Sequence, residues 1–219
     1  MIATISADIV SSTSLTSEET ILLKQKIEYL FQVIESKYPD FWGRQIKGDY
    51  LECYIPNVSD ALRIALLIKA YIKSVIFAER KQSKAFYTYG LRMAIGIGDM
   101  RIVDKEHGIL DGEAIYLSGR AMEDMNSLSK GTMLLKINVP QLASSLNTVC
   151  VLVDALMNST TKRQSEVVFY KLLSMKETDI ADRMGISQAS VNEHSTSARW
   201  YCLENALDYF EHINFTEYE

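Results

Sequence analysis

The chain has 219 residues, of which 47% are hydrophobic and 23% are charged, and its formal net charge is −5. These proportions are those of an ordinary soluble globular protein, and the length accommodates one domain of about 150 residues and a smaller second one. The negative charge excludes sequence-independent binding of nucleic acid or of an anionic membrane over the whole surface, so any DNA contact must be local.

The cysteines and the apolar segments indicate a cytoplasmic protein. Three cysteines lie far apart without C-x-x-C spacing, which favours neither a disulfide framework nor a thiolate metal site. Residues 1–8 carry no basic region and do not resemble a signal peptide. The longest apolar stretch, residues 61–77, is interrupted by Arg63, Lys69 and Lys73, whereas a membrane span needs about 20 mostly uncharged residues. We therefore expect no membrane partner.

The first part of the chain predicts a strand, a long amphipathic helix and a hairpin of two short strands, over residues 2–10, 17–38, 41–46 and 50–55. Ser17 is expected to cap the helix, and Lys47-Gly48-Asp49 to form the hairpin turn. Asp8 ends the first strand and Asp49 precedes the last one, so both carboxylates are expected at strand ends.

The next part predicts a helix capped by Ser59, a strand, a second helix and a further strand, over residues 59–76, 91–97, 113–125 and 132–137. The order β-α-β-β-α-β-α-β is typical of a ferredoxin-like α/β (α+β) sandwich with helices on one face of a mixed sheet. A helix from Pro140 and a polar linker over residues 158–163 follow. We predict two domains, residues 1–157 and 158–219.

Residues 175–199 have the pattern of two helices joined by a tight turn. Ala181 is small where the helices would cross, Gly185 permits a left-handed turn, and Ser187 caps the second helix. The apolar residues expected between the helices are Ile180, Met184, Ile186 and Val191. This segment resembles the helix-turn-helix of bacterial regulators. With helices expected over residues 166–173 and 198–213, it predicts a small all-α domain.

The second helix of such a motif enters the major groove of DNA with its first residues. Gln188 and Asn192 can each pair with adenine, and Ser190 can contact several bases. Arg183 and Arg199 are predicted phosphate contacts. Residues 158–200 contain six Lys or Arg and five Asp or Glu, so we expect only a modest electrostatic contribution from phosphate contacts. The alternative is that the unit only packs against a partner protein or the first domain.

The amino-terminal strand ends suggest a second site. Asp8 and Asp49 offer the hard oxygen ligands that suit Mg²⁺ or Mn²⁺ bound to phosphates. Ser12 and Thr13, at a turn before a helix, can offer backbone N–H groups to a phosphate. The alternative is that Asp8 caps a turn and that Asp49 forms one.

Four segments occur in the order, and near the spacing, of the class III adenylate/guanylate cyclase domain: residues 7–13, 47–51, 91–98 and 112–120. The resemblance covers about residues 1–137 and implies a cyclase-like sandwich. It also implies that Asp8 and Asp49 bind metal, and that Arg120 binds the phosphates of a nucleoside triphosphate.

Three positions depart from the cyclase pattern. Tyr116 stands where the family has an asparagine that stabilises the transition state, and Gln45 and Ile109 stand at the two base-selecting positions. The late lysine-bearing strand of the family is not recognisable. Losing one transition-state donor typically costs about 10²–10³ in rate, so we assign no catalytic residue and expect no ordinary cyclase activity. A degenerate cyclase-like domain followed by a helix-turn-helix resembles the SatD-type proteins.

These patterns predict a DNA-binding transcriptional regulator whose cyclase-like domain binds a nucleotide, a divalent metal or both as a signal. The alternative is a divergent class III nucleotide cyclase with an accessory helix-turn-helix. We expect a homodimer, because the resemblance places Arg120 of one subunit across from the aspartates of the other. Operators also commonly mirror the two-fold symmetry of the protein that binds them.

Overall fold

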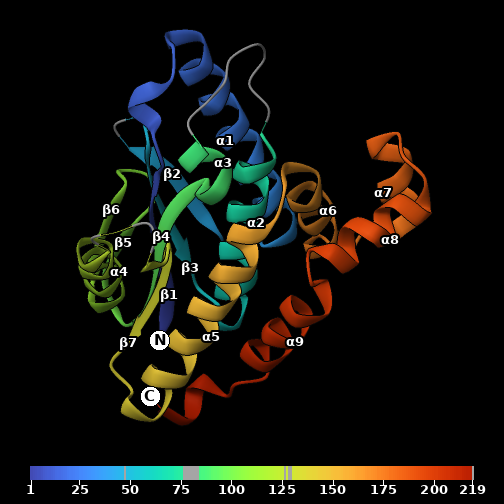
Figure 1. The fold of residues 1–219 in the computed structure, drawn as a ribbon. Helices are drawn as coiled ribbons and strands as arrows, with labels where there is room; N and C mark the ends of the chain where they lie inside the picture. The colour runs from blue at the N-terminus through green and yellow to red at the C-terminus, as the bar shows by residue number, and fades with distance from the viewer. Residues whose placement is uncertain (47, 76–83, 126, 128–129, 219) are drawn as a thin grey trace.

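The structure is a computed structural model, and it describes residues 1–219 except 47, 76–83, 126, 128–129 and 219. The fold is of the mixed α+β class, as predicted, with a sheet covered by helices (Figure 1). The predicted Lys47 of the hairpin turn and the end of the helix predicted to residue 76 lie outside the described residues.

Within the described residues, five strands form the main sheet in the order β2-β3-β1-β4-β7. The central strand β1 (Ile2–Ile9) pairs antiparallel with β3 (Tyr50–Ile55) and with β4 (Leu91–Gly98). At the edges, β2 (Trp42–Ile46) is antiparallel to β3, and β7 (Met133–Ile137) is parallel to β4. The alternation and the β-rich composition of these segments therefore predicted all five strands of this sheet.

Helices cover both faces of the sheet, which corrects the prediction that they lie on one face. On one face lie α1 (Ser17–Lys37), α2 (Ala61–Ser74) and α5 (Pro140–Ser159), whereas α4 (Glu113–Asp124) packs on the opposite face (Figure 1). The main core lies between the sheet and the first three helices.

The two faces of β1 show why α4 can pack on the second face. Ala3, Ile5 and Ala7 are buried in the main core, while Thr4 and Ser6 point the other way and are also buried. Both hydroxyls make hydrogen bonds to the Ser118 hydroxyl of α4, at 3.0 and 2.9 Å. This face of β1 thus packs against α4 through hydroxyl groups. Because these residues are not apolar, the hydrophobic pattern of the sequence does not predict the contact.

Gly96 in β4 permits the close approach of α4. A Cβ atom at this position would lie 2.1 Å from the carbonyl oxygen of Ala114 and 2.5 Å from the backbone nitrogen of Ser118. Both atoms belong to the helix backbone, which moves less readily than a side chain. Only a residue without a Cβ lets the strand and the helix come this close.

Several local details differ from the predictions. Thr16, rather than Ser17, caps α1, in a capping box with Glu19. Ser59 does not cap α2 but lies in a short 3-10 helix over Val58–Asp60. The sequence analysis did not predict α3 (Lys84–Tyr89) or the separate hairpin of β5 (Met100–Asp104) and β6 (Ile109–Gly112).

The carboxy-terminal helices are α6 (Lys162–Leu172), α7 (Glu177–Met184), α8 (Gln188–Ser197) and α9 (Trp200–Glu211). Apolar side chains of α6 and α9 belong to the main core, namely Val168, Phe169, Leu172, Leu203, Leu207 and Phe210. By contrast, α7 and α8 share a small cluster of their own with Val167 of α6 and project from the body (Figure 1).

The predicted polar linker over residues 158–163 is wrong, because α5 continues to Ser159 and α6 begins at Lys162. Thr161 caps α6 through a capping box with Gln164, which lets one helix follow the other almost directly. The domain boundary at residue 157, which falls inside α5, stays a prediction.

The helix α5 is long and apolar enough to cross a membrane, with a mean hydropathy of 1.2. One face of α5 packs in the core of the protein through Leu146, Cys150, Val153 and Met157, whereas Val151 and Leu152 are exposed. Core helices of soluble proteins often have such a composition, and the packing of α5 is consistent with a soluble protein.

Candidate functional site

The strand ends bring four of the predicted residues together. Asp8, Ser12, Thr13 and Asp49 line one hollow of about 340 Å³. The backbone N–H of Ile9 donates to the carbonyl of Asp49 at 3.0 Å, which joins the end of β1 to the residue before β3. The antiparallel pairing of these strands therefore places both aspartates at the edge of the same hollow.

Each of the two carboxylates already has a partner. Asp8 accepts a hydrogen bond from Arg92 Nε at 2.9 Å and a second contact from Arg92 Nη2. Arg92 lies directly opposite Asp8 in the register of β1 and β4, and its hydrogen bond with Asp8 raises the pKa of the guanidinium. Asp49 accepts from the Ser12 hydroxyl at 2.6 Å. Arg92 is thus a site residue that the sequence analysis missed.

In the arrangement seen here, Asp8 and Asp49 do not present an open set of oxygen ligands to a metal ion. Arg92 neutralises one of the two carboxylates and occupies both of its oxygens. Among the described residues, no group of three or more His, Cys, Asp or Glu side chains could hold a metal ion. Mg²⁺ and Mn²⁺ bind several oxygen ligands at once, and here the Arg92 guanidinium occupies the oxygens of Asp8 that would serve as ligands.

The backbone at the edge of the hollow adopts an unusual conformation. Ser11 has φ 60° and ψ 27°, in the left-handed region, and leads into a short 3-10 helix over Ser12–Ser14. A residue with a Cβ pays about 1–2 kcal/mol for this conformation. Such strain concentrates at binding sites, where the surrounding structure holds it in place.

The other residues implied by the cyclase resemblance lie outside this hollow. Arg120 is exposed on α4 and is not among the residues that line it. The Tyr116 hydroxyl donates to the Asp111 carboxylate, which also pairs with Arg101. Gln45 donates to the carbonyl of Gly48, and Ile109 lies half-exposed on β6. Within one chain, the structure therefore brings Gln45 to the residue before Asp49, but it does not bring Arg120, Tyr116 or Ile109 to the two aspartates.

The helices α7 and α8 have the local geometry that the sequence predicted. Gly185 ends α7 in the left-handed region, at φ 63°, and Ser187 caps α8 by accepting from the N–H of Ser190 at 3.1 Å. Gln188 and Asn192 are exposed on α8, four residues apart and on one face. Ser190 is half-buried, and its hydroxyl makes a hydrogen bond to that of Ser187 at 2.9 Å.

The two predicted phosphate contacts have different surroundings. Arg183 of α7 donates to the Tyr170 hydroxyl at 3.2 Å and to the Tyr29 hydroxyl of α1 at 3.3 Å, and its guanidinium lies 5.3 Å from the Tyr170 ring. Arg199 is exposed at the start of α9, where it adopts φ 58°. Arg183 therefore faces the body of the protein, and Arg199 faces solvent.

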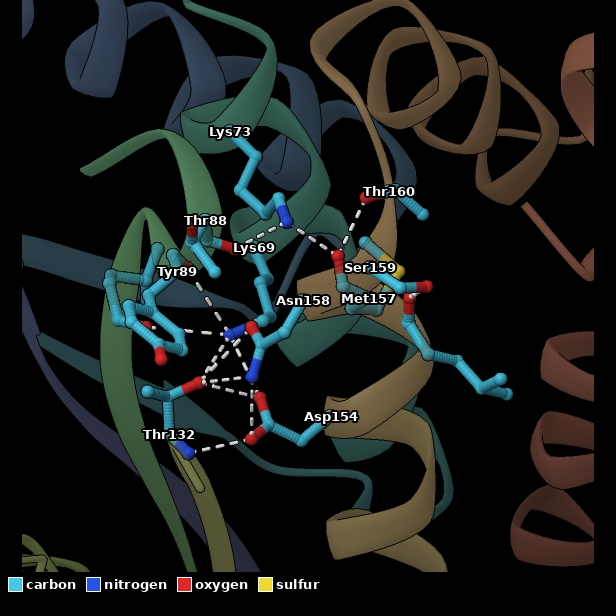
Figure 2. A network of polar contacts seen from close by, with 12 residues as sticks. Lys69, Lys73, Thr88, Tyr89, Thr132, Asp154, Met157, Asn158, Ser159 and Thr160 are labelled. Carbon is cyan, nitrogen blue, oxygen red and sulfur yellow. Dashed lines mark hydrogen bonds and ion pairs between the residues drawn. The ribbon is translucent and has the colours of Figure 1, made fainter. Parts of the chain in front are cut away.

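A buried polar network lies where α2, α5 and the start of β7 meet (Figure 2). Lys69 is fully buried and pairs with Asp154, at 2.9 Å between Nζ and Oδ1. Asp154 also accepts from the backbone and hydroxyl of Thr132, at 2.6 and 2.7 Å, and from Asn158 at 3.0 Å. Burial lowers the pKa of Lys69, and Asp154 opposes that shift.

Lys73 lies one turn further along α2 and is also buried. Its ammonium group donates to the backbone carbonyls of Thr88 and Met157, both visible in Figure 2, at 2.6 and 2.5 Å. Burial, with the nearby charge of Lys69, lowers the pKa of Lys73 to about 7. The i, i+4 spacing of two lysines inside an apolar run was the signal in the sequence, because it places both on one face of a core helix.

Comparisons with known proteins leave the family open. The chain matches no protein-family model and no curated protein. Among solved structures, a bacterial light-regulated adenylyl cyclase is similar over 61% of this chain and 74% of that chain, with 17% sequence identity and a TM-score of 0.42. A likeness of this degree carries no argument about what this chain does.

Proposed function

We propose that the protein binds duplex DNA through α8 and acts as a transcriptional regulator. The observation that carries the proposal is the exposed first part of α8, which follows the Gly185 turn and presents Gln188 and Asn192 to solvent. Side chains with paired donors and acceptors at this place in such a motif recognise adenine in the major groove. We also propose, on the resemblance of the sequence, that the protein is related to SatD-type proteins.

The charge around α8 determines what kind of binding to expect. Between Lys176 and Arg199, three basic residues stand against four acidic ones, and Arg183 faces the protein body. Phosphate contacts therefore contribute little, and the affinity depends on base contacts. We expect weak nonspecific binding and a shallow dependence of the binding constant on salt.

Selection of bound duplexes from a randomised pool, followed by fluorescence anisotropy, tests the proposal. Gln188→Ala should weaken the selected site by about 1–3 kcal/mol and relax the preference at one base pair. Arg199→Ala should weaken all duplexes equally and reduce the salt slope by about one. Gln141→Ala makes the same change at an exposed position of α5 and should have no effect. If no duplex binds above background at low salt, α7 and α8 form a protein-interaction surface and the proposal fails.

We propose nucleotide or divalent-metal binding at the strand-end hollow as a second candidate function, with divergent cyclase activity as its enzymatic form. It is favoured by the placement of Asp8, Asp49, Ser12 and Thr13 around one hollow. The pairing of Asp8 with Arg92 opposes it, because a cation would have to displace the guanidinium. Arg120 would reach this hollow only from a second subunit, so the candidate also requires a homodimer.

Calorimetric titration with Mn²⁺, alone and with ATP, tests this second candidate. Arg92→Ala removes the competing guanidinium and should strengthen Mn²⁺ binding, whereas Asp49→Ala should weaken it. Asp208→Ala removes an exposed carboxylate on α9 and is the matched control. Equal affinity for ATP with and without a chelator, or a monomer at every concentration in ultracentrifugation, would remove the candidate.

A further inference from the structure

A pocket of about 610 Å³ lies between the body of the protein and α7, away from the strand-end hollow. Residues of α1, α2, α6 and α7 form its walls, and those that matter for the argument are Lys26, Tyr29, Tyr71, Arg163, Tyr170 and Arg183. Its volume lies within the range of about 300–1,000 Å³ that is typical of sites for single small molecules.

The charge of the pocket is opposite in sign to that of the whole chain. Lys26, Arg163 and Arg183 line it together with one acidic residue, Glu166, in a chain of net charge −5. Glu166 pairs with Arg163 at 3.1 Å. Among the described residues, no carboxylate forms an ion pair with Lys26 or Arg183, so the pocket holds two cations that an anion can satisfy.

Aromatic rings form another wall of the same pocket. The rings of Tyr29 and Tyr71 lie 6.1 Å apart, Tyr71 and Phe169 lie 5.0 Å apart, and Phe169 and Tyr170 lie 5.4 Å apart. The Tyr71 ring is half-buried, and burial raises the pKa of its hydroxyl to about 12. Such faces take up a planar ring by offset or edge-to-face stacking.

We propose that this pocket binds a planar aromatic anion, a small molecule that carries a ring and a carboxylate or phosphate group. The rings of Tyr29 and Tyr71 contact its ring, and Lys26 and Arg183 contact its charge. Arg183 connects the ligand to α7, because it lies in the pocket and donates to tyrosines of both α1 and α6. The proposal concerns a ligand site on the free protein and does not rest on DNA binding.

Four probes separate the contributions of ring and charge in calorimetric titrations of the full chain. Salicylate and AMP carry both features, phenol carries only the ring, and inorganic phosphate carries only the charge. We expect saturable one-site binding of salicylate, AMP or both, at least ten-fold tighter than that of phenol and phosphate. The absence of saturable binding by both aromatic anions, or equally tight binding of phosphate alone, overturns the proposal.

Matched variants locate the binding. Lys26→Ala and Arg183→Ala should each weaken it about ten-fold or more. Lys24 is an exposed lysine on the same helix that pairs with Glu28 outside the pocket, so Lys24→Ala should leave the binding unchanged. Loss in the Lys24 variant equal to that in the Lys26 variant overturns the proposal. So does AMP binding that Asp49→Ala abolishes and Lys26→Ala leaves intact, since it would then belong to the strand-end hollow.

Discussion

The ion pair between Lys69 and Asp154 offers the most quantitative test of the structure. Asp154→Asn keeps the shape of the side chain and a carbonyl oxygen for the N–H of Thr132, so it removes chiefly the negative charge. The Lys69 ammonium is then left fully buried without a counter-charge. Breaking a buried pair from one side typically costs about 3–5 kcal/mol of unfolding free energy.

The free energy needed to deprotonate Lys69 sets an upper limit on this loss of unfolding free energy. Instead of remaining charged, the lysine can become neutral, which at pH 7 costs a group of ordinary pKa about 4.6 kcal/mol. At pH 9 the same step costs about 2 kcal/mol. We therefore expect Asp154→Asn to lose about 3–4.6 kcal/mol at pH 7 and no more than about 2 kcal/mol at pH 9.

Urea unfolding at the two pH values measures both numbers. The double variant Lys69→Met with Asp154→Leu removes both charges and should be more stable at pH 7 than Asp154→Asn, because no buried charge is left unpaired. Asp208→Asn, on the surface of α9, should stay within about 0.5 kcal/mol of the wild type. A loss below about 1 kcal/mol at pH 7, or a loss unchanged at pH 9, would refute the buried pair.

The other tests concern the second lysine, the α4 contact and the attachment of α9. The pKa of Lys73 is about 7 in the folded protein, below its value of 10.5 in the unfolded chain. Between these two pH values the unfolded chain binds more protons, so the free energy of unfolding rises with pH. Lys73→Met should reduce this rise, measured by urea unfolding at several pH values, by up to about 1.4 kcal/mol per pH unit. Gly96→Ala should cost about 1–3 kcal/mol or more of unfolding free energy because its Cβ would meet the α4 backbone. Gly119→Ala, in the same helix with open space around it, should stabilise by up to about 1 kcal/mol, and a loss there would contradict the placement of α4. Arg63 holds Glu211 through two hydrogen bonds, at 2.6 and 3.1 Å, so Glu211→Gln should speed amide hydrogen exchange in α9 more than elsewhere, and uniform exchange would argue against this contact.

Local patterns predicted most of the elements, because each depends on a few neighbouring residues. Alternation along β1 and β3 follows from which side chains enter the main core, and it predicted both strands. The start of α8 follows from Gly185 and Ser187, whose conformation and cap depend on nearby backbone atoms alone. The juxtaposition of Asp8 and Asp49 followed from strand order.

The features that the sequence analysis missed all depend on pairing between distant segments. Arg92 neutralises Asp8 because β4 lies beside β1 in a register that places these two residues opposite each other. The packing of α4 on the second face depends on Ser118 meeting hydroxyls more than 110 positions earlier in the chain. The residues next to Arg92 and Ser118 in the sequence do not indicate these contacts, since a single arginine or serine can take part in many kinds of interaction.

The attachment of α7 and α8 limits how a signal can reach them. They pack on Val167 of α6, so the pair cannot swing as a free body without exposing Val167 and apolar residues of its own such as Ile180. What can change at little cost is the side of α7 that faces α1, where Arg183 reaches Tyr29 across a pocket open to solvent. A ligand that binds the guanidinium of Arg183 would replace its hydrogen bonds to Tyr170 and Tyr29. It would influence α8 only if a second arrangement of α7 existed and the ligand bound the two with different affinity. If the pocket and α8 are coupled, the contact through which a ligand would act is therefore the one that Arg183 makes with Tyr29.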